Sequence, residues 1–159
     1  NISKVAAALL PLLQQLDADN SAAYQQRADD FSQRWQAAMQ RWETKAAPLR
    51  GVAVVVHHRS WSDLQQWLGL NEVATLEPKP GVPASAGHLA EVLQQMDAQP
   101  ARMIIRAAYQ DGRADEWLAD KTGLPAIALP FTVGGSEQAQ DLFSLYDDTI
   151  SRLLDGLAP

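Results

Sequence analysis

The sequence predicts an α/β fold, a four-stranded parallel sheet flanked by helices and preceded by a long connecting helix. Four short apolar runs alternate with segments of helical periodicity, and strands joined through helices pair in parallel. The first run is almost all valine, as is typical of strands that are buried on both faces. A long polar segment with regularly spaced aromatic residues precedes these runs, and it predicts the connecting helix.

The first fifty residues are predicted to be helical. Residues 2 to about 16 carry apolar side chains at helical spacing, and Pro11 predicts a kink or a helix start. The polar stretch 17–21 is rich in N-cap residues, so a long helix should follow, to about Ala47. The spacing of its stripe indicates a face packed in the core, with a partner-binding face as the alternative; the stripe comprises Tyr24, Ala28, Phe31, Trp35, Met39 and Trp42.

Pro48 and Gly51 mark the change to alternating strands and helices. Residues 77–83 contain three prolines and predict an extended loop, after which Ser85 should cap a helix. The predicted strands are 52–56, 72–76, 102–106 and 126–129. The predicted helices are 62–68, a segment after Ser85 that carries Leu89, Val92, Leu93 and Met96, then 113–122 and 138–157.

Composition excludes several classes of function. The chain has 159 residues, enough for one sizeable core, and a net charge of −6 without any run of Lys or Arg. Nucleic acid is therefore not an expected partner. The absence of cysteine excludes disulfides and thiolate ligands. No apolar stretch approaches the ~20 residues that span a bilayer, and the start lacks signal-peptide features. We expect a cytoplasmic protein or a piece of an exported one.

Two of the three histidines, His57 and His58, stand where the first strand ends. In open parallel sheets, ligands bind beyond the carboxyl ends of the strands. If the strand continues, the two side chains point to opposite faces, one toward the core and one toward the cleft. Such a histidine can ligate a metal, act as a general base or fill a structural role, and the structural role is the commoner. The third histidine, His88, is interpreted as a surface or capping residue, so a zinc set of three or four ligands is incomplete.

No catalytic motif is present. A Gly-x-Ser-x-Gly elbow is missing, and the stretch 132–135 lacks the lysine of a phosphate-binding loop. We interpret that stretch as a turn or hinge, and we do not expect an enzyme.

Several motifs, taken together, resemble one family. Residues 16–24 fit a pattern of leucine, acid, asparagine and tyrosine, and the valine strand that ends in histidine is followed by Trp-Leu-Gly-Leu. Closer to a zinc-binding subgroup are the stretches 58–61 (HRSW), 77–83 (EPKPGVP), 120–123 (DKTG), and 129–130 with 133–135. Over essentially the whole chain, the sequence resembles the C-terminal lobe of the zinc/manganese-type solute-binding proteins of bacterial ABC importers.

The resemblance implies two α/β lobes joined by a long helix, with the metal held between them. Residues 1–50 would then be connecting helices and 51–159 the C-terminal lobe, with the N-terminal lobe of the same protein absent. The resemblance also implies a periplasmic protein that is not membrane-spanning, with zinc or manganese bound in the intact protein and an ABC transporter permease as partner. His58 matches the family's C-lobe histidine ligand, whereas His57 occupies a position that is often tyrosine or serine.

The sequence departs from this family at two ligand positions. A carboxylate often follows the third strand, where this chain has Arg106-Ala107-Ala108-Tyr109, and an aspartate often follows the fourth, where it has Phe131. Asp111 or Glu77 could substitute. One neutral imidazole holds Zn²⁺ poorly, so we expect weak or no metal binding by these 159 residues alone.

Two functional hypotheses follow. The first is a periplasmic metal-binding module that delivers zinc to a permease. The second is a divergent relative without metal binding, which acts as an interaction module or binds a small organic ligand beside Trp61 and Tyr109. The unfilled ligand positions favour the second hypothesis, and His58 favours the first.

Overall fold

The computed structural model describes residues 1–158 and divides into two compact units, one from Asn1 to Trp42 and one from Glu43 onward. The first unit is helical. The second contains the sheet and every residue of the candidate site.

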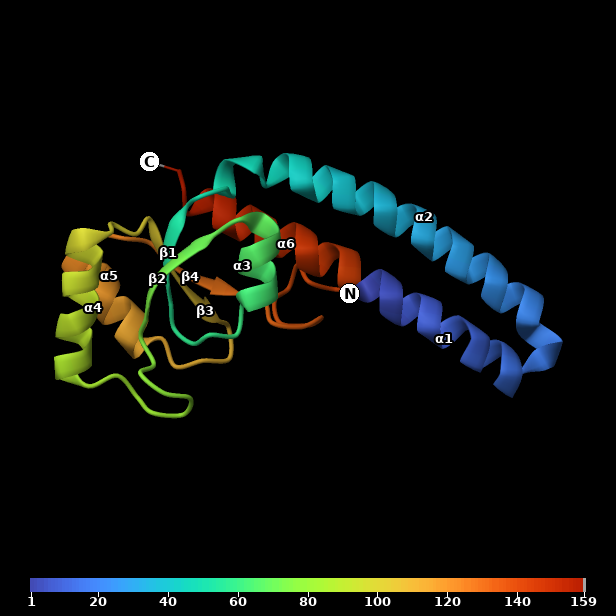
Figure 1. The fold of residues 1–159 in the computed structure, drawn as a ribbon, viewed down its shortest axis with the longest axis horizontal. Coiled ribbons are helices and arrows are strands. Elements are labelled where there is room, and N and C mark those ends of the chain that lie inside the picture. The colour runs from blue at the N-terminus through green and yellow to red at the C-terminus, as the bar shows by residue number, and fades with distance from the viewer. Residues whose placement is uncertain (159) are drawn as a thin grey trace. The chain divides into compact units, whose positions relative to one another are not determined.

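The helical unit is a hairpin of two helices. Helix α1 spans Ile2–Leu16, a short 3₁₀ turn η1 spans Ala18–Asn20, and α2 spans Ser21–Lys45 and thus continues just beyond the unit. Asp17 stabilises the turn, because its carboxylate accepts hydrogen bonds from the Asn20 amide at 2.9 Å and the Tyr24 hydroxyl at 3.0 Å. Consequently α1 and α2 lie side by side in the ribbon view (Figure 1).

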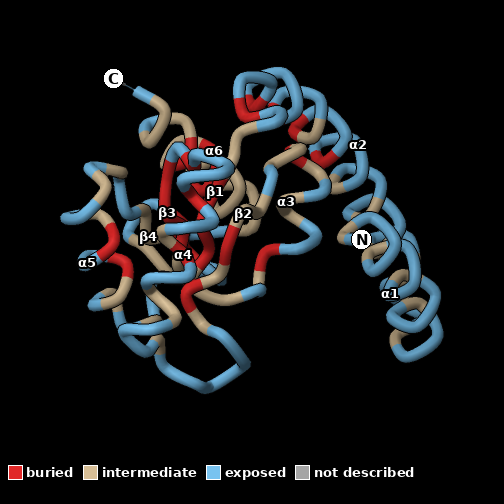
Figure 2. The backbone as a smooth tube through the Cα atoms, turned by 60° about the vertical axis from the view of Figure 1, so that its left-hand side comes forward, coloured by how far each residue is buried: buried red, intermediate tan, exposed pale blue. Residues whose placement is uncertain are grey.

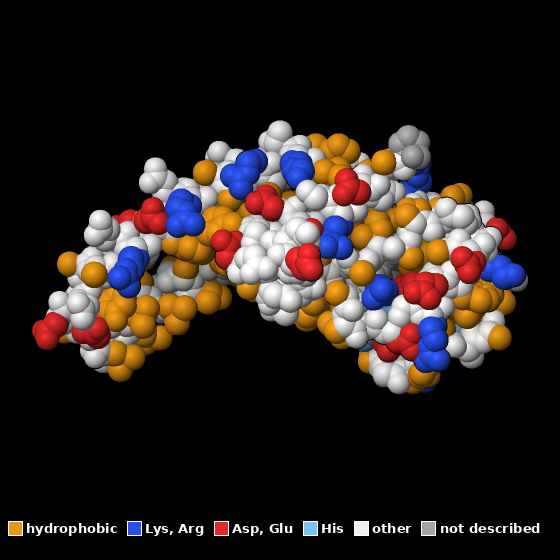
Figure 3. Space-filling view, turned by 180° about the vertical axis from the view of Figure 1, so that it is seen from behind, with side chains coloured by type: hydrophobic (Ala, Val, Ile, Leu, Met, Phe, Trp, Pro, Cys, Tyr) orange, Lys and Arg blue, Asp and Glu red, His pale blue; other side chains and the backbone are white. Residues whose placement is uncertain are grey.

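Helix α1 keeps its apolar face exposed. It runs without a break through Pro11, and none of its residues is buried. Val5 and Leu16 are 55% and 84% exposed, and hydrophobic side chains gather along this unit in the space-filling view (Figure 3). On α2, Trp35 and Trp42 are buried and their rings meet edge to face at 5.2 Å. Both belong to the predicted stripe, whereas the third buried residue of the helix, Ala38, does not.

The second unit is built on the predicted four-stranded parallel sheet. The strands lie in the order β2-β1-β3-β4, and every pairing between neighbours is parallel. Their bounds are β1 Ala53–Val56, β2 Asn71–Thr75, β3 Met103–Ala107 and β4 Ala126–Leu129. Each bound agrees with the predicted strand to within one residue.

Helices cover both faces of the sheet. In Figure 1, α4 and α5 lie on one side of the strands, and α3 and α6 on the other. This arrangement follows from right-handed crossovers, because the chain leaves β1 toward β2 and then reverses direction to reach β3. The bounds are η2 Ala47–Leu49, α3 Ser62–Leu68, α4 Ala86–Ala98, α5 Arg113–Thr122 and α6 Leu142–Asp155.

The core lies along the central strands β1 and β3, in which all residues but one of each strand are buried (Figure 2). Val55 of β1 and Ile104 of β3 pack in one cluster with Val92 of α4 and Leu118 of α5. His57 follows directly after β1, and its ring contacts Asp115 of α5, the helix that supplies Leu118 to this cluster. The core therefore fixes the orientation of one candidate site residue.

Two helices differ from the prediction in their bounds, and α6 also ends at Asp155, two residues before the predicted end. Helix α6 begins at Leu142 and not at Gln138, because Asp141 forms a capping box in which its side chain accepts from the Ser144 N–H at 2.7 Å. Helix α2 ends at Lys45, just before the 3₁₀ turn that contains Pro48. Among residues 1–158, no helix is both long and apolar enough to span a bilayer.

Candidate functional site

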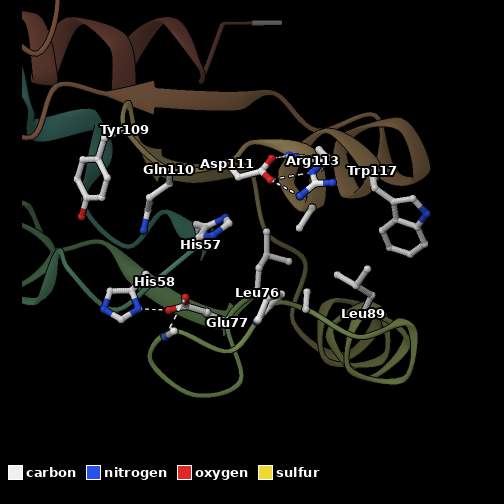
Figure 4. Close-up of a pocket in the computed structure, with 14 residues that line it drawn as sticks. His57, His58, Leu76, Glu77, Leu89, Tyr109, Gln110, Asp111, Arg113 and Trp117 are labelled. Carbon is white, nitrogen blue, oxygen red and sulfur yellow. Dashed lines mark hydrogen bonds and ion pairs between the residues drawn. The ribbon is translucent and has the colours of Figure 1, made fainter.

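A cavity of about 780 Å³ opens at the carboxyl ends of β1, β2 and β3. Its polar lining comes mainly from the loops that follow these strands (Figure 4). Its apolar lining comes from the loop after β2 and from the first turns of α4 and α5. The chain diverges here, since β1 leads to one side of the sheet and β3 to the other, and such switch points are where open α/β sheets bind ligands. The polar lining residues include His57, His58, Glu77, Tyr109, Gln110, Asp111 and Arg113.

Both histidines at the end of β1 line this cavity. The condition for opposite faces, a strand that continues through both residues, is not met, because the strand ends at Val56 and the chain bends through residues 57–59. The His57 N–H still donates to the Ile105 carbonyl at 2.8 Å, whereas the His58 carbonyl already accepts from the Ser60 N–H at 2.7 Å in a tight turn. The bend therefore brings the second imidazole to the same cavity as the first.

His58 forms a hydrogen-bonded pair with Glu77. The imidazole Nδ1 contacts the carboxylate Oε2, and the other carboxylate oxygen, Oε1, accepts from the Gly81 N–H at 3.1 Å. The His58 side chain is 30% exposed and that of Glu77 is 17% exposed. If Nδ1 donates its proton to Glu77, the Nε2 lone pair is free to bind a metal ion.

His57 forms a second pair, with Asp115 in the first turn of α5. Nδ1 lies 2.7 Å from Asp115 Oδ2, and Asp115 is completely buried. Among the described residues, the other carboxylate oxygen, Oδ1, has no hydrogen-bond partner. The bond to Asp115 is the main reason that the pKa of His57 is raised, and the nearby Glu77 carboxylate raises it further, whereas burial and Arg106 act in the opposite direction.

The remaining charged side chains near the cavity have other partners. Asp111 accepts from the Arg113 Nε at 2.7 Å, and this hydrogen bond lowers the pKa of Asp111. Arg106 pairs with neither Asp111 nor Glu77. Instead, its guanidinium donates to backbone carbonyls, including that of Gln110 at 3.1 Å. Of the two acids suggested as substitute ligands, Glu77 is thus the one beside a histidine.

The third histidine has a structural position. The His88 N–H donates to the Ser85 hydroxyl that caps α4, and its ring Nε2 lies 2.8 Å from the Thr75 carbonyl. His88 is not among the residues that line the cavity. The N-cap of α4 is thus Ser85 and not His88, whose ring is held by a backbone carbonyl outside the cavity.

Three aromatic side chains lie together where the chain leaves β1, β3 and β4. Phe131 stands between Tyr109 and Trp61, with edge-to-face ring distances of 5.4 Å and 5.5 Å. Tyr109 lines the cavity and is exposed, whereas Trp61 is buried and does not line it. These positions provide apolar surface in place of metal-binding oxygens.

The sequence analysis did not identify Asp115. The sequence does contain an indication of its burial. Asp115 and Leu118 lie three residues apart, on the inward face of α5, the helix that follows β3, the neighbour of β1. An acid at such a position requires a buried partner. The partner, His57, lies 58 residues away in the chain, and no local pattern connects the two.

The cavity contains donor groups of the kinds that bind metal ions. Neutral imidazole nitrogen and carboxylate oxygen suit zinc and similar divalent ions. Within the described part of the chain, however, no three His, Cys, Asp or Glu side chains gather closely enough to hold an ion. A metal bound here needs further ligands from another polypeptide segment, from water or from a small molecule.

Comparisons with known proteins agree with this fold. A ZnuA crystal structure is similar with a TM-score of 0.82 and 18% identity, and the match covers 99% of this chain and 56% of that one. A Cd-bound periplasmic metal-binding protein from Candidatus Liberibacter asiaticus gives a TM-score of 0.74 at 15% identity, covering 99% and 61%. A Zn(II)-bound mutant variant of AdcAII from Streptococcus pneumoniae gives 0.72 at 20% identity, covering 98% and 57%.

The chain thus spans little more than half the length of these solved structures, and at these identities the likeness concerns the fold. A search of curated protein sequences finds no match. A family model described as zinc-uptake complex component A, periplasmic (ZnuA) matches residues 1–156, nearly the whole sequence. The chain therefore belongs to the ZnuA family.

Proposed function

We propose that this chain is the C-terminal lobe of a periplasmic solute-binding protein and binds a divalent metal ion through His58. The ion proposed is zinc, with manganese as the second choice. The position of the His58 ring carries the proposal. It stands at the carboxyl end of a buried strand, lines the cavity and has Nδ1 against Glu77. Metal-binding histidines commonly bond a carboxylate in this way, because it fixes the tautomer and leaves the opposite nitrogen free for the ion.

The protein would not act as an enzyme in this proposal but as a carrier that delivers the ion to an ABC transporter permease. Residues 1–50 would connect the lobes and 51–159 would form the C-terminal lobe. An N-terminal lobe of the same protein would supply the missing ligands, which fits a chain that covers 56% of the ZnuA structure. Closure of two lobes over an ion is a known route to selective capture. It also accounts for a site that is incomplete within one lobe.

Zinc binding by an isolated lobe should be weak. A structural or catalytic zinc ion takes at least three protein ligands, and the described residues gather fewer than three. A submicromolar zinc affinity of the 159-residue chain would contradict this reasoning.

The decisive experiment is metal analysis of the intact parent protein beside its His58→Ala variant. Loss of a direct ligand should weaken zinc binding by about a hundredfold or more, since loss of an outer-shell partner already costs roughly 10–100-fold. His88→Ala is the matched control, because it removes an imidazole outside the cavity, bonded to a backbone carbonyl. If zinc content is the same in all three proteins, His58 is not a ligand.

A second candidate function rests on the aromatic edge of the cavity. Tyr109 and Phe131 stand where carboxylate ligands are common in the family, and both are exposed. A divergent relative with this edge would bind a small organic molecule or a protein surface in place of a metal. Zinc-independent ligand binding by the intact protein, unaffected by His58→Ala, would favour this second function.

A further inference from the structure

We infer that His57 is a second metal-binding imidazole of this lobe, so that the end of β1 offers an ion two ring nitrogens. The inference rests on the proposed function of His58 and extends it to a residue that the family resemblance leaves without a role. It depends on three features of the structure: the bend after Val56, the two carboxylate partners, and the charge around the rings.

The bend places both rings at one cavity. If β1 continued in extended form, His57 and His58 would face opposite sides of the sheet, and only one of them could reach the cleft. Both in fact line the cavity, and Figure 4 shows their rings at the same end of it, with the Glu77 carboxylate nearby. Two neighbouring residues are thus available to one ion.

The two imidazoles are held in the same manner. Each ring has Nδ1 against a carboxylate oxygen, which is Asp115 Oδ2 at 2.7 Å for His57 and Glu77 Oε2 for His58. With the proton on Nδ1, both rings keep an unprotonated Nε2, the form that binds metal. His88 differs, because its Nε2 already contacts the Thr75 carbonyl at 2.8 Å.

The hydrogen bond to His57 is the one that the Asp115 side chain makes among the described residues. Its side chain is completely buried, and among residues 1–158 its second oxygen, Oδ1, has no hydrogen-bond partner. A buried carboxylate costs stability unless its oxygens are bonded, and replacement of a whole buried pair by apolar residues is often neutral or better. Retention of an acid at this position is explained if it must hold the imidazole toward the cavity.

The charges around His57 suit a bound cation. Asp115 and Glu77 both act electrostatically on the ring, and the nearest cationic side chain, Arg106, has its guanidinium hydrogen-bonded to backbone carbonyls. The Asp111 carboxylate also interacts electrostatically with His57, although its ion pair with Arg113 offsets its charge. Two carboxylates beside two neutral imidazoles can balance the charge of one divalent ion.

The chain has only three histidines, so each ring can be followed separately by NMR. We would label the histidine rings of the 159-residue chain with ¹⁵N and titrate it with Zn²⁺ alone, assigning the signals from His57→Gln and His58→Gln. The expected result is a zinc-dependent shift of Nε2 in both His57 and His58, with His88 unchanged. Weak binding does not obscure this result, because a rapidly exchanging ion still moves the averaged signal.

The alternative outcomes separate the inference from the proposed function. A shift of His58 alone overturns the inference and leaves the proposed function standing. A shift of neither ring overturns both. A shift of His57 alone supports a metal-binding role for His57 and overturns the assignment of His58.

The Asp115→Asn variant tests the orienting role. We expect the zinc affinity reported by the His57 signal to fall by about tenfold, the lower end of the range for outer-shell partners, while His58 still responds. Circular dichroism on the same sample checks that the variant is folded. If Asp115→Asn leaves the zinc response of His57 unchanged, then Asp115 does not position the ring for metal, and the argument for His57 fails.

Discussion

The two histidine–carboxylate pairs at the end of β1 have the same chemistry but different surroundings. In one, Asp115 is held in the first turn of α5, and the side-chain exposures are 16% for His57 and 0% for Asp115. In the other, Glu77 lies in the loop after β2, and the exposures are 30% for His58 and 17% for Glu77. One carboxylate is thus fixed in the core, whereas the other is attached to a segment that contacts solvent.

A metal site requires a ligand held in a fixed position and a ligand that can adjust when the ion arrives, and the two pairs differ in this respect. A buried carboxylate on a helix cannot follow a moving ligand, so Asp115 can only set the position of one ring. Glu77 is held by His58 and by the Gly81 N–H, both at the rim of the cavity. It can therefore adjust when an ion or a second lobe arrives. We expect mutations of the first pair to change folding stability in addition to the zinc response of His57, and mutations of the second pair to change metal binding with little loss of stability.

The largest effect on folding is predicted for Asp115→Ala. The free energy of unfolding should fall by about 2–4 kcal/mol, because removing one partner leaves the other partly buried and unpaired and opens a small void. Urea denaturation at neutral pH measures it. Glu77→Ala is the matched control, and its cost should stay below about 1 kcal/mol, as for a partly exposed pair.

A double-mutant cycle with His57→Ala refines this test. If the two groups interact only with each other, the effect of Asp115→Ala should shrink markedly in the His57→Ala background. Equal losses of stability for Asp115→Ala and Glu77→Ala would show that burial does not distinguish the pairs.

The buried pair should also make stability depend on pH. Because the hydrogen bond to Asp115 raises the pKa of His57 in the folded state, the pair stabilises most below the unfolded pKa of about 6.5, and the contribution is lost as pH rises through the folded value. The stability difference between the natural chain and Asp115→Asn should therefore narrow as the pH is raised. The midpoints of urea denaturation of both proteins, measured from below pH 6.5 upward, report this difference. A difference that does not change with pH would contradict the hydrogen-bonded pair of His57 and Asp115.

Features of the two pairs that depend on residues close together in the chain could be predicted from the sequence, whereas features that depend on distant segments could not. Strand ends, the Ser85 cap and the place of His58 at the sheet edge follow from local patterns of a few residues, and the structure agrees with them. The bend at 57–59 and the contact of His57 with Asp115 depend on how α5 packs on the sheet. Patterns of a few neighbouring residues do not show how distant segments pack, and the partner of His57 is 58 residues away. Such patterns therefore assign no role to His57.

The rim pair should dominate metal binding. Glu77→Gln keeps the shape of the side chain and an oxygen that can accept from the His58 ring, but it removes the negative charge. We expect zinc affinity of the intact protein to fall by about tenfold with little change in stability, since outer-shell partners raise the basicity of their histidine. Calorimetric zinc titration measures it. An unchanged affinity would mean that Glu77 holds the loop but does not assist the ion.

The smallest effect is predicted for His88→Ala, which removes an imidazole outside both pairs. Its ring bonds the Thr75 carbonyl at 2.8 Å and lies 3.4 Å from the Glu91 carboxylate, which is 70% exposed. Loss of one such hydrogen bond should cost about 1 kcal/mol of unfolding free energy, because water can replace part of it, and zinc affinity should not change. Denaturation and zinc titration of the same preparation measure both quantities. A loss of zinc binding in this variant would mean that the metal site extends to the first turn of α4. His88 would then have to be counted as part of the site, beside the two histidine–carboxylate pairs.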